Sequence, residues 1–293
     1  MISRSLRTSR STGIRAAFSF GLLLVLGASS SSMAFGQVIF QDRFGPEFKD
    51  CPDCPTMVMI PGGSFVMGSP PDEPEAHNTE RPQHTVDMPA FAVGVHEVTF
   101  EQWDACVADG GCYFSPDDEG WGRGDRPVIN VSWHEAQLYL AWLSDETGHS
   151  YRLLSESESE YVTRAGTTGR FNTGNCITTD QANFLGYFPY PGCPSGVYRE
   201  QTLSVGSFLP NAFGLYDTHG NVSEWTQDCY NFGYEGAPTD GSAWMTGDCE
   251  KAILRSGSWG MPGEKMRSSF RSGVSRDLRR YYIGFRVARA VTP

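Results

Sequence analysis

Glycine and proline interrupt this chain so often that long regular elements are excluded over much of its length. Its 293 residues include 33 Gly and 18 Pro, and over 169–293 a Gly, Pro, Asn or Asp recurs every few residues. Glycine costs backbone entropy in a regular element and proline removes an N–H donor, so both break helices and strands. The chain still has 18 Phe, 12 Tyr and 7 Trp, which are enough to build a core. We therefore predict an irregular, loop-rich α+β fold in a single domain.

Three segments in the middle of the chain carry the signals of helices. In each, a Ser or Thr is followed three positions later by Gln or Glu, which is the capping-box pattern of a helix start. A glycine then marks each end. The helices are expected between Thr99 and Gly110, between Ser132 and Gly148, and between Ser155 and Gly166. The apolar face of the second is expected to comprise Ala136, Leu138, Leu140, Ala141 and Leu143.

Short strands are expected before the first helix. Residues 57–67 favour two strands around the turn Pro61-Gly62-Gly63, and residues 85–98 favour a second pair. Between them, residues 69–83 are acidic, rich in proline and irregular.

The first 36 residues have the features of a signal peptide. Four arginines precede the mostly apolar run 16–28, and small residues at Ala34 and Gly36 favour cleavage before Gln37. The apolar run is too short for a hydrocarbon core of roughly 30 Å. We therefore expect a secreted or periplasmic protein with no membrane span after signal removal, an N-terminal arm over 37–56 and one domain over 57–293.

Cysteine usage agrees with export. All eight cysteines follow the signal segment, and an even number in an exported chain indicates disulfides. They lie in sequence-local couples, so the simplest of the many possible pairings is Cys51–Cys54, Cys106–Cys112, Cys176–Cys193 and Cys229–Cys249.

The charge balance limits the classes of partner. The chain has 34 Asp and Glu against 23 Lys and Arg, a net charge of −11. A nucleic-acid binder needs a basic surface to neutralise phosphates, so we expect no nucleic-acid partner.

An ordered set of short motifs covers nearly all of the chain after the signal segment. They are MIPGGSFVMGS at 59–69, ERPQH at 80–84, HEVT at 96–99, RPVINVSW at 126–133, YRLLSE at 151–156, NAFGLYD at 211–217, GNVSEW at 220–225, LRSGSW at 254–259 and GFR at 284–286. In this order and spacing the chain resembles the formylglycine-generating enzymes, also called sulfatase-modifying factors. The resemblance implies a fold related to C-type lectins.

The resemblance also implies a site where this chain departs from the family. Family members oxidise a sulfatase cysteine to formylglycine with copper held by two cysteine thiolates, which suit Cu(I) because both are soft. Those cysteines lie just after the motif that matches Ser258-Trp259. This chain has no cysteine after Cys249 and offers only the neutral thioethers Met261 and Met266 there. We therefore expect no copper, and we expect the two methionines to pack.

Side chains around this position are candidates for a binding cleft. They are Ser258, Trp259, Met261, Arg267 and Arg271. The two arginines belong to a basic stretch that continues through Arg276, Arg279 and Arg280. It would either hold an anionic ligand or pair with carboxylates inside the fold, and the second interpretation is favoured.

Calcium is the cofactor that the resemblance favours. In the family, a loop supplies Ca²⁺ with a carboxylate or amide, backbone carbonyls and a Glu, and the matching positions are Asp217, Gly220, Val222 and Glu224. Calcium prefers six to eight hard oxygen ligands, which such a loop offers. A second family site would use Asn183 and the Phe184 carbonyl, but its acidic partner is not evident.

Two classes of function therefore remain. The motif framework without its cysteine pair favours an exported, non-redox binding module with a calcium-stabilised loop, whose partner is a peptide, a glycan or an exported protein. The alternative is an enzyme, either an oxidase like the formylglycine-generating enzymes or a divergent oxidoreductase of the same family. A structural component of the cell envelope is a third possibility.

Overall fold

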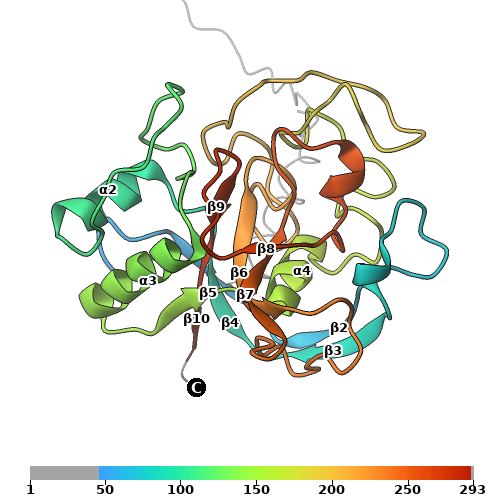
Figure 1. Ribbon diagram of the computed structural model, residues 1–293, viewed down its shortest axis with the longest axis horizontal. Helices are drawn as coiled ribbons and strands as arrows, with labels where there is room; N and C mark the ends of the chain where they lie inside the picture. The colour runs from blue at the N-terminus through green and yellow to red at the C-terminus, as the bar shows by residue number, and fades with distance from the viewer. Residues whose placement is uncertain (1–45, 292–293) are drawn as a thin grey trace, which may run out of the picture.

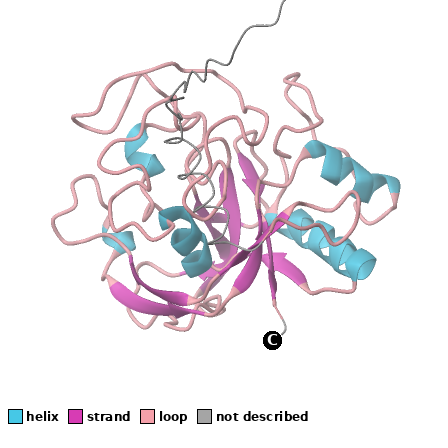
Figure 2. Cartoon of the chain, turned by 180° about the vertical axis from the view of Figure 1, so that it is seen from behind, coloured by secondary structure: helices cyan, strands magenta, loops and turns pink. Residues whose placement is uncertain are grey.

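The computed structural model describes residues 46–291, so the predicted signal peptide, its cleavage site and the first part of the arm lie outside the described residues. Two four-stranded sheets form the centre of the molecule, and loops make up most of its outline (Figures 1 and 2). The predicted α+β class and its loop-rich character are confirmed.

The first sheet has the strand order β1-β4-β10-β5, and all its pairs are antiparallel. Its strands are β1 (Met57–Ile60), β4 (Phe91–Gly94), β10 (Val287–Ala290) and β5 (Tyr151–Leu153). The C-terminal strand β10 thus lies between β4 and β5, which come more than 130 residues earlier in the chain. This arrangement closes the domain on itself.

The second sheet has the order β8-β7-β6-β9. Its long central strands β6 (Ser223–Tyr230) and β7 (Asp248–Arg255) are antiparallel, and β9 (Ile283–Phe285) runs parallel to β6. The strand β8 (Ser272–Ser275) lies at the other edge. The loop-rich second half of the chain therefore contributes this whole sheet.

Strands β2 (Gly63–Met67) and β3 (His84–Met88) form a separate two-stranded sheet. The four N-terminal strands are nested, since β1 pairs with β4 and β2 with β3. The two expected couples exist as strands, but they are not hairpins. The short connections at Pro61-Gly62 and Pro89-Ala90 carry the chain from one sheet to the other instead of folding it back.

The three helices begin where the capping boxes predict. Thr99, Ser132 and Ser155 are the N-caps of α2 (Phe100–Ala108), α3 (Trp133–Thr147) and α4 (Glu156–Arg164), and each box makes both of its hydrogen bonds. Figure 1 places α2 and α3 together on one side of the central strands, opposite the β2–β3 pair. Two short 3-10 helices, η1 (Asn78–Glu80) and η2 (Gly263–Met266), complete the elements.

Two helix details differ from expectation. Leu138 and Ala141 of α3 are exposed, and the buried face is formed by larger rings on Trp133, Tyr139 and Trp142 together with Ala136, Leu140 and Leu143. Helix α4 ends at Arg164, and its C-cap is Ala165 and not Gly166, because Ala165 itself takes the left-handed conformation with φ 45°. The packing of the aromatic rings thus determines the buried face of α3, and the conformation of Ala165 determines where α4 ends.

All four predicted disulfides are confirmed: Cys51–Cys54, Cys106–Cys112, Cys176–Cys193 and Cys229–Cys249. They account for every cysteine of the chain. Within residues 46–291 we find no helix with the length and apolar character that crossing a bilayer requires.

Candidate functional site

The loop 217–224 is a tight turn leading into β6. Asp217, Gly220 and Asn221 all have positive φ values, of 56°, 82° and 56°. A Cβ at Gly220 would lie 2.3 Å from the carbonyl oxygen of Asn183, so only glycine allows these two segments to approach this closely. Asn221 N donates to that same oxygen over 2.9 Å. The loop is thereby fixed against the segment that contains Asn183 and Phe184, the residues of the second predicted calcium site.

Three carboxylates gather at this loop around a single arginine. The buried Arg286 binds Glu224, with Nη2 2.9 Å from Oε1. Glu97 Oε2 accepts from Asn221 Nδ2 over 2.7 Å, and Glu97 Oε1 accepts from Val222 N over 3.1 Å. Asp217 Oδ2 accepts from Gly206 N over 2.7 Å. Ionised, these groups would carry more negative charge than one guanidinium balances.

The pKa values reflect this excess of negative charge. Burial, with the neighbouring charges of Asp217 and Glu224, raises the pKa of Glu97 well above its usual range. Burial raises the pKa of Asp217 to about 6, although the Gly206 N–H and Arg286 act in the other direction. A cation at this loop would relieve the repulsion.

Asn183 has a buried side-chain oxygen that is not hydrogen-bonded to any described residue. Its side chain is buried and its Nδ2 donates to the Gln201 carbonyl over 2.9 Å. Its Oδ1 is buried and has no hydrogen-bond partner among the described residues. An unsatisfied buried acceptor costs about 1–3 kcal/mol, which makes this atom available to a ligand. The adjacent Phe184 buries its ring in the interior.

The donor set of this region fits a hard cation. Carboxylate, amide and carbonyl oxygens are the ligands that calcium prefers. Among residues 46–291, no group of three or more His, Cys, Asp or Glu side chains is arranged to hold a metal by itself. Calcium here would therefore depend on backbone carbonyls as well as on side chains.

Trp259 lies beside the same loop, in an aromatic cluster. The backbone N–H of Trp259 donates to the Asn221 carbonyl over 3.0 Å. Its ring stacks on Tyr198 with centroids 5.9 Å apart, meets Trp121 edge-on at 5.4 Å and contacts Tyr281 at 5.7 Å. Tyr281 is 42% exposed, and Tyr187, which packs against Tyr198, is 64% exposed. The cluster, which we call the Trp259 aromatic surface, therefore presents rings to solvent.

Ser258 and the two methionines lie on the interior side of this surface. Ser258 is buried, and its Oγ has no partner among the described residues. Met266 is fully buried in a cluster with Phe171, Phe184 and other apolar side chains, and Met261 packs against that cluster. Both thioethers thus fill space between hydrophobic groups. No thiolate is available to copper, because every cysteine is in a disulfide.

Arg267 and Arg271, the other two cleft candidates, are buried in ion pairs. Arg267 Nη2 lies 2.7 Å from Glu80 Oε1, and Arg271 Nη2 lies 2.7 Å from Glu156 Oε2. Burial alone would raise the pKa of Glu80, but the hydrogen bonds and charge of Arg267 outweigh it and lower that pKa. The pKa of Glu156 is lowered in the same way, chiefly by the charges of Arg271 and Arg255. Both guanidinium groups hold the fold together instead of facing an open cleft.

The rest of the basic stretch is also engaged within the fold. Arg279 forms an ion pair with Glu135, and Arg276 stacks over the Trp133 ring at 4.1 Å. Arg280 donates to the Arg279 carbonyl over 2.9 Å. The interpretation in which this stretch pairs inside the protein is therefore confirmed for its ion-pairing members.

Sequence reasoning missed several residues of the site. Glu97 and Arg286 stand in the motifs HEVT and GFR, but nothing in either motif shows that the two residues meet at the loop 217–224. Trp121 and Tyr198 carry no local signal at all. The fold alone brings them to Trp259.

The chain matches the family model described as "Sulfatase-modifying factor enzyme 1-like domain" over residues 44–291. Among solved structures, it is similar to PvdO from Pseudomonas aeruginosa, with 39% identity, a TM-score of 0.75 and coverage of 85% of this chain and 99% of that one. The match begins inside the predicted arm, where Phe48 bridges to Met57.

Curated relatives are more distant. The serine/threonine-protein kinase Pkn1 of Chlamydia trachomatis is 28% identical over 84% of this chain and 40% of its own length. The chain thus spans about 40% of the length of the first curated relatives it matches. A mouse protein named inactive C-alpha-formylglycine-generating enzyme 2 is 26% identical, over 80% of this chain and 85% of that protein.

Proposed function

Because this chain belongs to the sulfatase-modifying factor family, whose domain model it matches over residues 44–291, we propose that it uses the family fold for binding and not for oxidation. It would act as an exported module with a calcium-stabilised loop. Its partner would be a peptide, a glycan or an exported protein. Four disulfides support export, since such bonds persist in oxidising compartments.

The observation that carries the proposal is the filling of the thiolate position by methionine. Met266 is fully buried among apolar side chains, and Met261 packs against the same cluster. A thioether has no charge to stabilise Cu(I) in the way that a thiolate pair does. The residues at this position do not fit the copper centre that the family resemblance implies.

The Trp259 aromatic surface is the proposed contact region for the partner. Aromatic rings contribute large contact areas at low entropy cost, and they are enriched where proteins bind partners. The exposed rings of Tyr187 and Tyr281 belong to this surface, and Trp259 within it is largely buried. The surface is well ordered because Trp259 is hydrogen-bonded to the loop 217–224.

Calcium would be held by the carboxylates of Asp217 and Glu224 with the carbonyls of Gly220 and Val222. The raised pKa of Asp217 and of Glu97 supports a cation here, because calcium would favour their ionised forms. A second ion would use Asn183, whose Oδ1 lacks a partner, and the Phe184 carbonyl. When bound, calcium would hold the loop in place, and through it Trp259.

The test is an oxidation assay on the full mature chain. Purified protein is incubated with copper, oxygen and a cysteine-containing sulfatase peptide, and the peptide is examined by mass spectrometry for conversion of cysteine to an aldehyde. We expect unmodified peptide. Aldehyde formation would overturn the proposal in favour of the alternative, an oxidase of the formylglycine-generating type.

The double variant Met261→Cys, Met266→Cys is the matched comparison. It places two thiols in the loop that follows Ser258-Trp259, and we expect it to bind Cu(I) more tightly than the parent chain. Equal copper binding by both proteins would show that the methionines are not what separates this chain from a copper site.

A further inference from the structure

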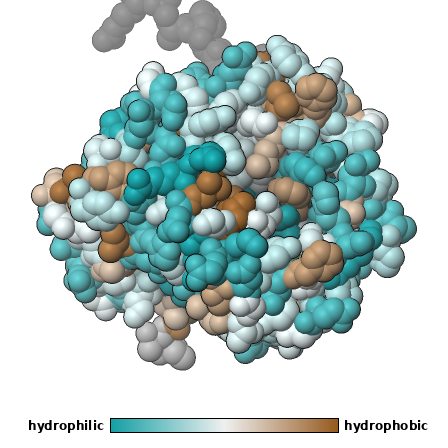
Figure 3. Space-filling model, viewed as in Figure 1, coloured by the Kyte–Doolittle hydropathy of each residue, from teal (hydrophilic) through white to brown (hydrophobic). Residues whose placement is uncertain are grey.

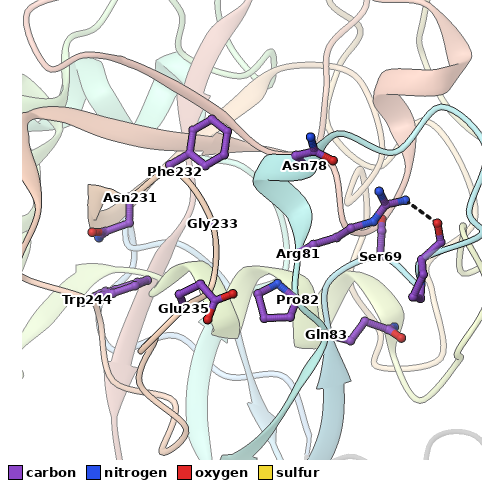
Figure 4. A pocket seen from close by; sticks show the side chains of 11 residues that line it. Ser69, Asn78, Arg81, Pro82, Gln83, Asn231, Phe232, Gly233, Glu235 and Trp244 are labelled. Atoms are coloured by element: carbon purple, nitrogen blue, oxygen red, sulfur yellow. Dashed lines mark hydrogen bonds between the residues drawn. The ribbon is translucent and has the colours of Figure 1, made fainter.

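A pocket of about 750 Å³ opens between the segment that contains η1 and the segment that follows β6 (Figure 4). Its volume is within the range of about 300–1,000 Å³ found for small-molecule sites. In Figure 4, Phe232 and Trp244 lie on one side of the pocket, and Asn78, Arg81 and Pro82 lie on the other. In this view Glu235 lies between Trp244 and Pro82.

Buried hydrogen bonds tie the two walls together. Nη1 of Arg271 donates to the Thr79 carbonyl over 2.9 Å on one wall and to the Asn231 carbonyl over 2.8 Å on the other. Tyr234 N donates to the Arg81 carbonyl over 2.9 Å. Asp228 Oδ1 accepts from Trp244 N over 2.8 Å, which fixes the start of the segment carrying that ring. The pocket is therefore preformed, and binding need not pay to order it.

Its lining combines flat apolar faces with unused polar groups. Phe232 is 70% exposed, and with Trp244 and Pro82 it offers ring surfaces to a ligand. The side chains of Asn78 and Glu235 are exposed and make no hydrogen bond to any residue in 46–291. Arg81 and Glu235 contribute opposite charges to the lining, and Arg81 Nη2 already donates to the Pro70 and Pro71 carbonyls. The charges balance, so an anionic or cationic ligand gains no general advantage.

A sugar ring matches this combination. A pyranose has one apolar face of C–H groups, which packs on an aromatic ring, and an equatorial edge of hydroxyls, each of which both donates and accepts. Amide, carboxylate and guanidinium groups are the planar partners that bind such hydroxyls in pairs. We propose that this pocket, between Arg81 and Trp244, is a carbohydrate-binding site for a neutral glycan of one to a few sugar rings. The inference goes beyond the proposed function, because the pocket shares no residue with the Trp259 aromatic surface.

The test starts with the full mature chain on an array of neutral and charged glycans, and the strongest binder is then used in isothermal titration calorimetry. Phe232→Ala and Glu235→Gln are the main variants, because both side chains are exposed and their loss leaves the core intact. We expect binding about tenfold weaker for Phe232→Ala, the effect of losing one aromatic contact of about 1.4 kcal/mol. Tyr113→Ala removes a ring that is 68% exposed and lies outside both the pocket lining and the Trp259 aromatic surface, so it is the matched control and should bind as the parent does. Tyr281→Ala tests the Trp259 aromatic surface as the other location for the glycan.

Three outcomes would overturn the carbohydrate site. They are the absence of any binder on the array, preference for charged over neutral glycans, and loss of binding in Tyr281→Ala with no effect of Phe232→Ala and Glu235→Gln. None of them bears on the oxidation assay, so failure of the glycan site is distinguishable from failure of the binding function.

Discussion

The loops 217–224 and 258–266 lie together, joined by the hydrogen bond from Trp259 N to the Asn221 carbonyl, yet they offer different atoms to a metal. At the first, Asp217 and the neighbouring Glu97 have raised pKa values next to one arginine. The second presents two thioethers that are packed against apolar side chains. The family resemblance places calcium at the first loop and copper at the second.

In the account proposed above, the fold keeps a site for a hard cation and loses one for a soft metal. The loop 217–224 positions the strand β6 and the backbone of Trp259, so changes there affect the whole domain. The methionines replace only the groups that would have held copper, and they add to the core. We therefore propose that hard-cation binding is coupled to the fold in this protein, whereas soft-metal binding is separable from it.

The largest effect is expected from Arg286→Ala, which removes the one cation among three carboxylates. Breaking a buried ion pair by removing one partner costs about 3–5 kcal/mol, because the remaining charge is left uncompensated. Urea unfolding of the metal-free protein would measure the loss. Lys251→Ala, which breaks an exposed pair with Asp248, is the control and should change stability little. Equal stabilities for the two variants would mean that the carboxylate cluster carries no excess charge.

A somewhat smaller loss is expected from Met266→Ala. Truncating a fully buried methionine costs about 2–5 kcal/mol, from lost apolar contact and the cavity left behind. Met261→Ala, at a partly buried position, should cost clearly less. Thermal unfolding of both variants compares them. A Met266→Ala protein as stable as the parent would contradict a packing role for this side chain.

Calcium should stabilise the protein by an amount that depends on pH. A ligand at a hundredfold excess over its Kd adds about 2.7 kcal/mol. The pKa of Asp217 in the folded protein is about 6, above its usual value of 3.8. In the calcium-free protein, the stability that Asp217 contributes is therefore fully present below about pH 4 and is lost as the pH rises through 6. Calcium binds the ionised form, so the melting-temperature difference between calcium and chelator should grow over the same interval.

Asp217→Asn is the control for this pH dependence. The asparagine keeps an oxygen ligand but has no group that titrates at this position. The melting-temperature difference between calcium and chelator should therefore become smaller and should change less with pH. If the melting-temperature difference rises through pH 6 as much in the variant as in the parent chain, another group must titrate there, and Glu97 is the first candidate.

Local signals in the sequence predicted much of this structure. The capping boxes at Thr99, Ser132 and Ser155 gave the helix starts because a cap depends on residues within one turn. The disulfides were predictable because their partners are close in sequence. The nested pairing of β1 with β4 was not, since strand pairing is decided by the packing of the whole sheet.

The site was predictable only in part for the same reason. The absence of cysteine near Trp259 is visible in the sequence, and so are the oxygen donors of the loop 217–224. The approach of Glu97 and Arg286 to that loop, and of Tyr198 to Trp259, depends on contacts between distant segments. The burial of Arg271 within the fold likewise appears only in three dimensions.

Metal analysis of the purified chain tests the contrast between the two loops most directly. Protein isolated without chelator, in buffer that contains both calcium and copper, is dialysed and its metals are measured by inductively coupled plasma mass spectrometry. The account predicts calcium in stoichiometric amount, held more weakly in Asp217→Asn, and no retained copper. Stoichiometric copper, or a parent chain that retains no calcium, would contradict it.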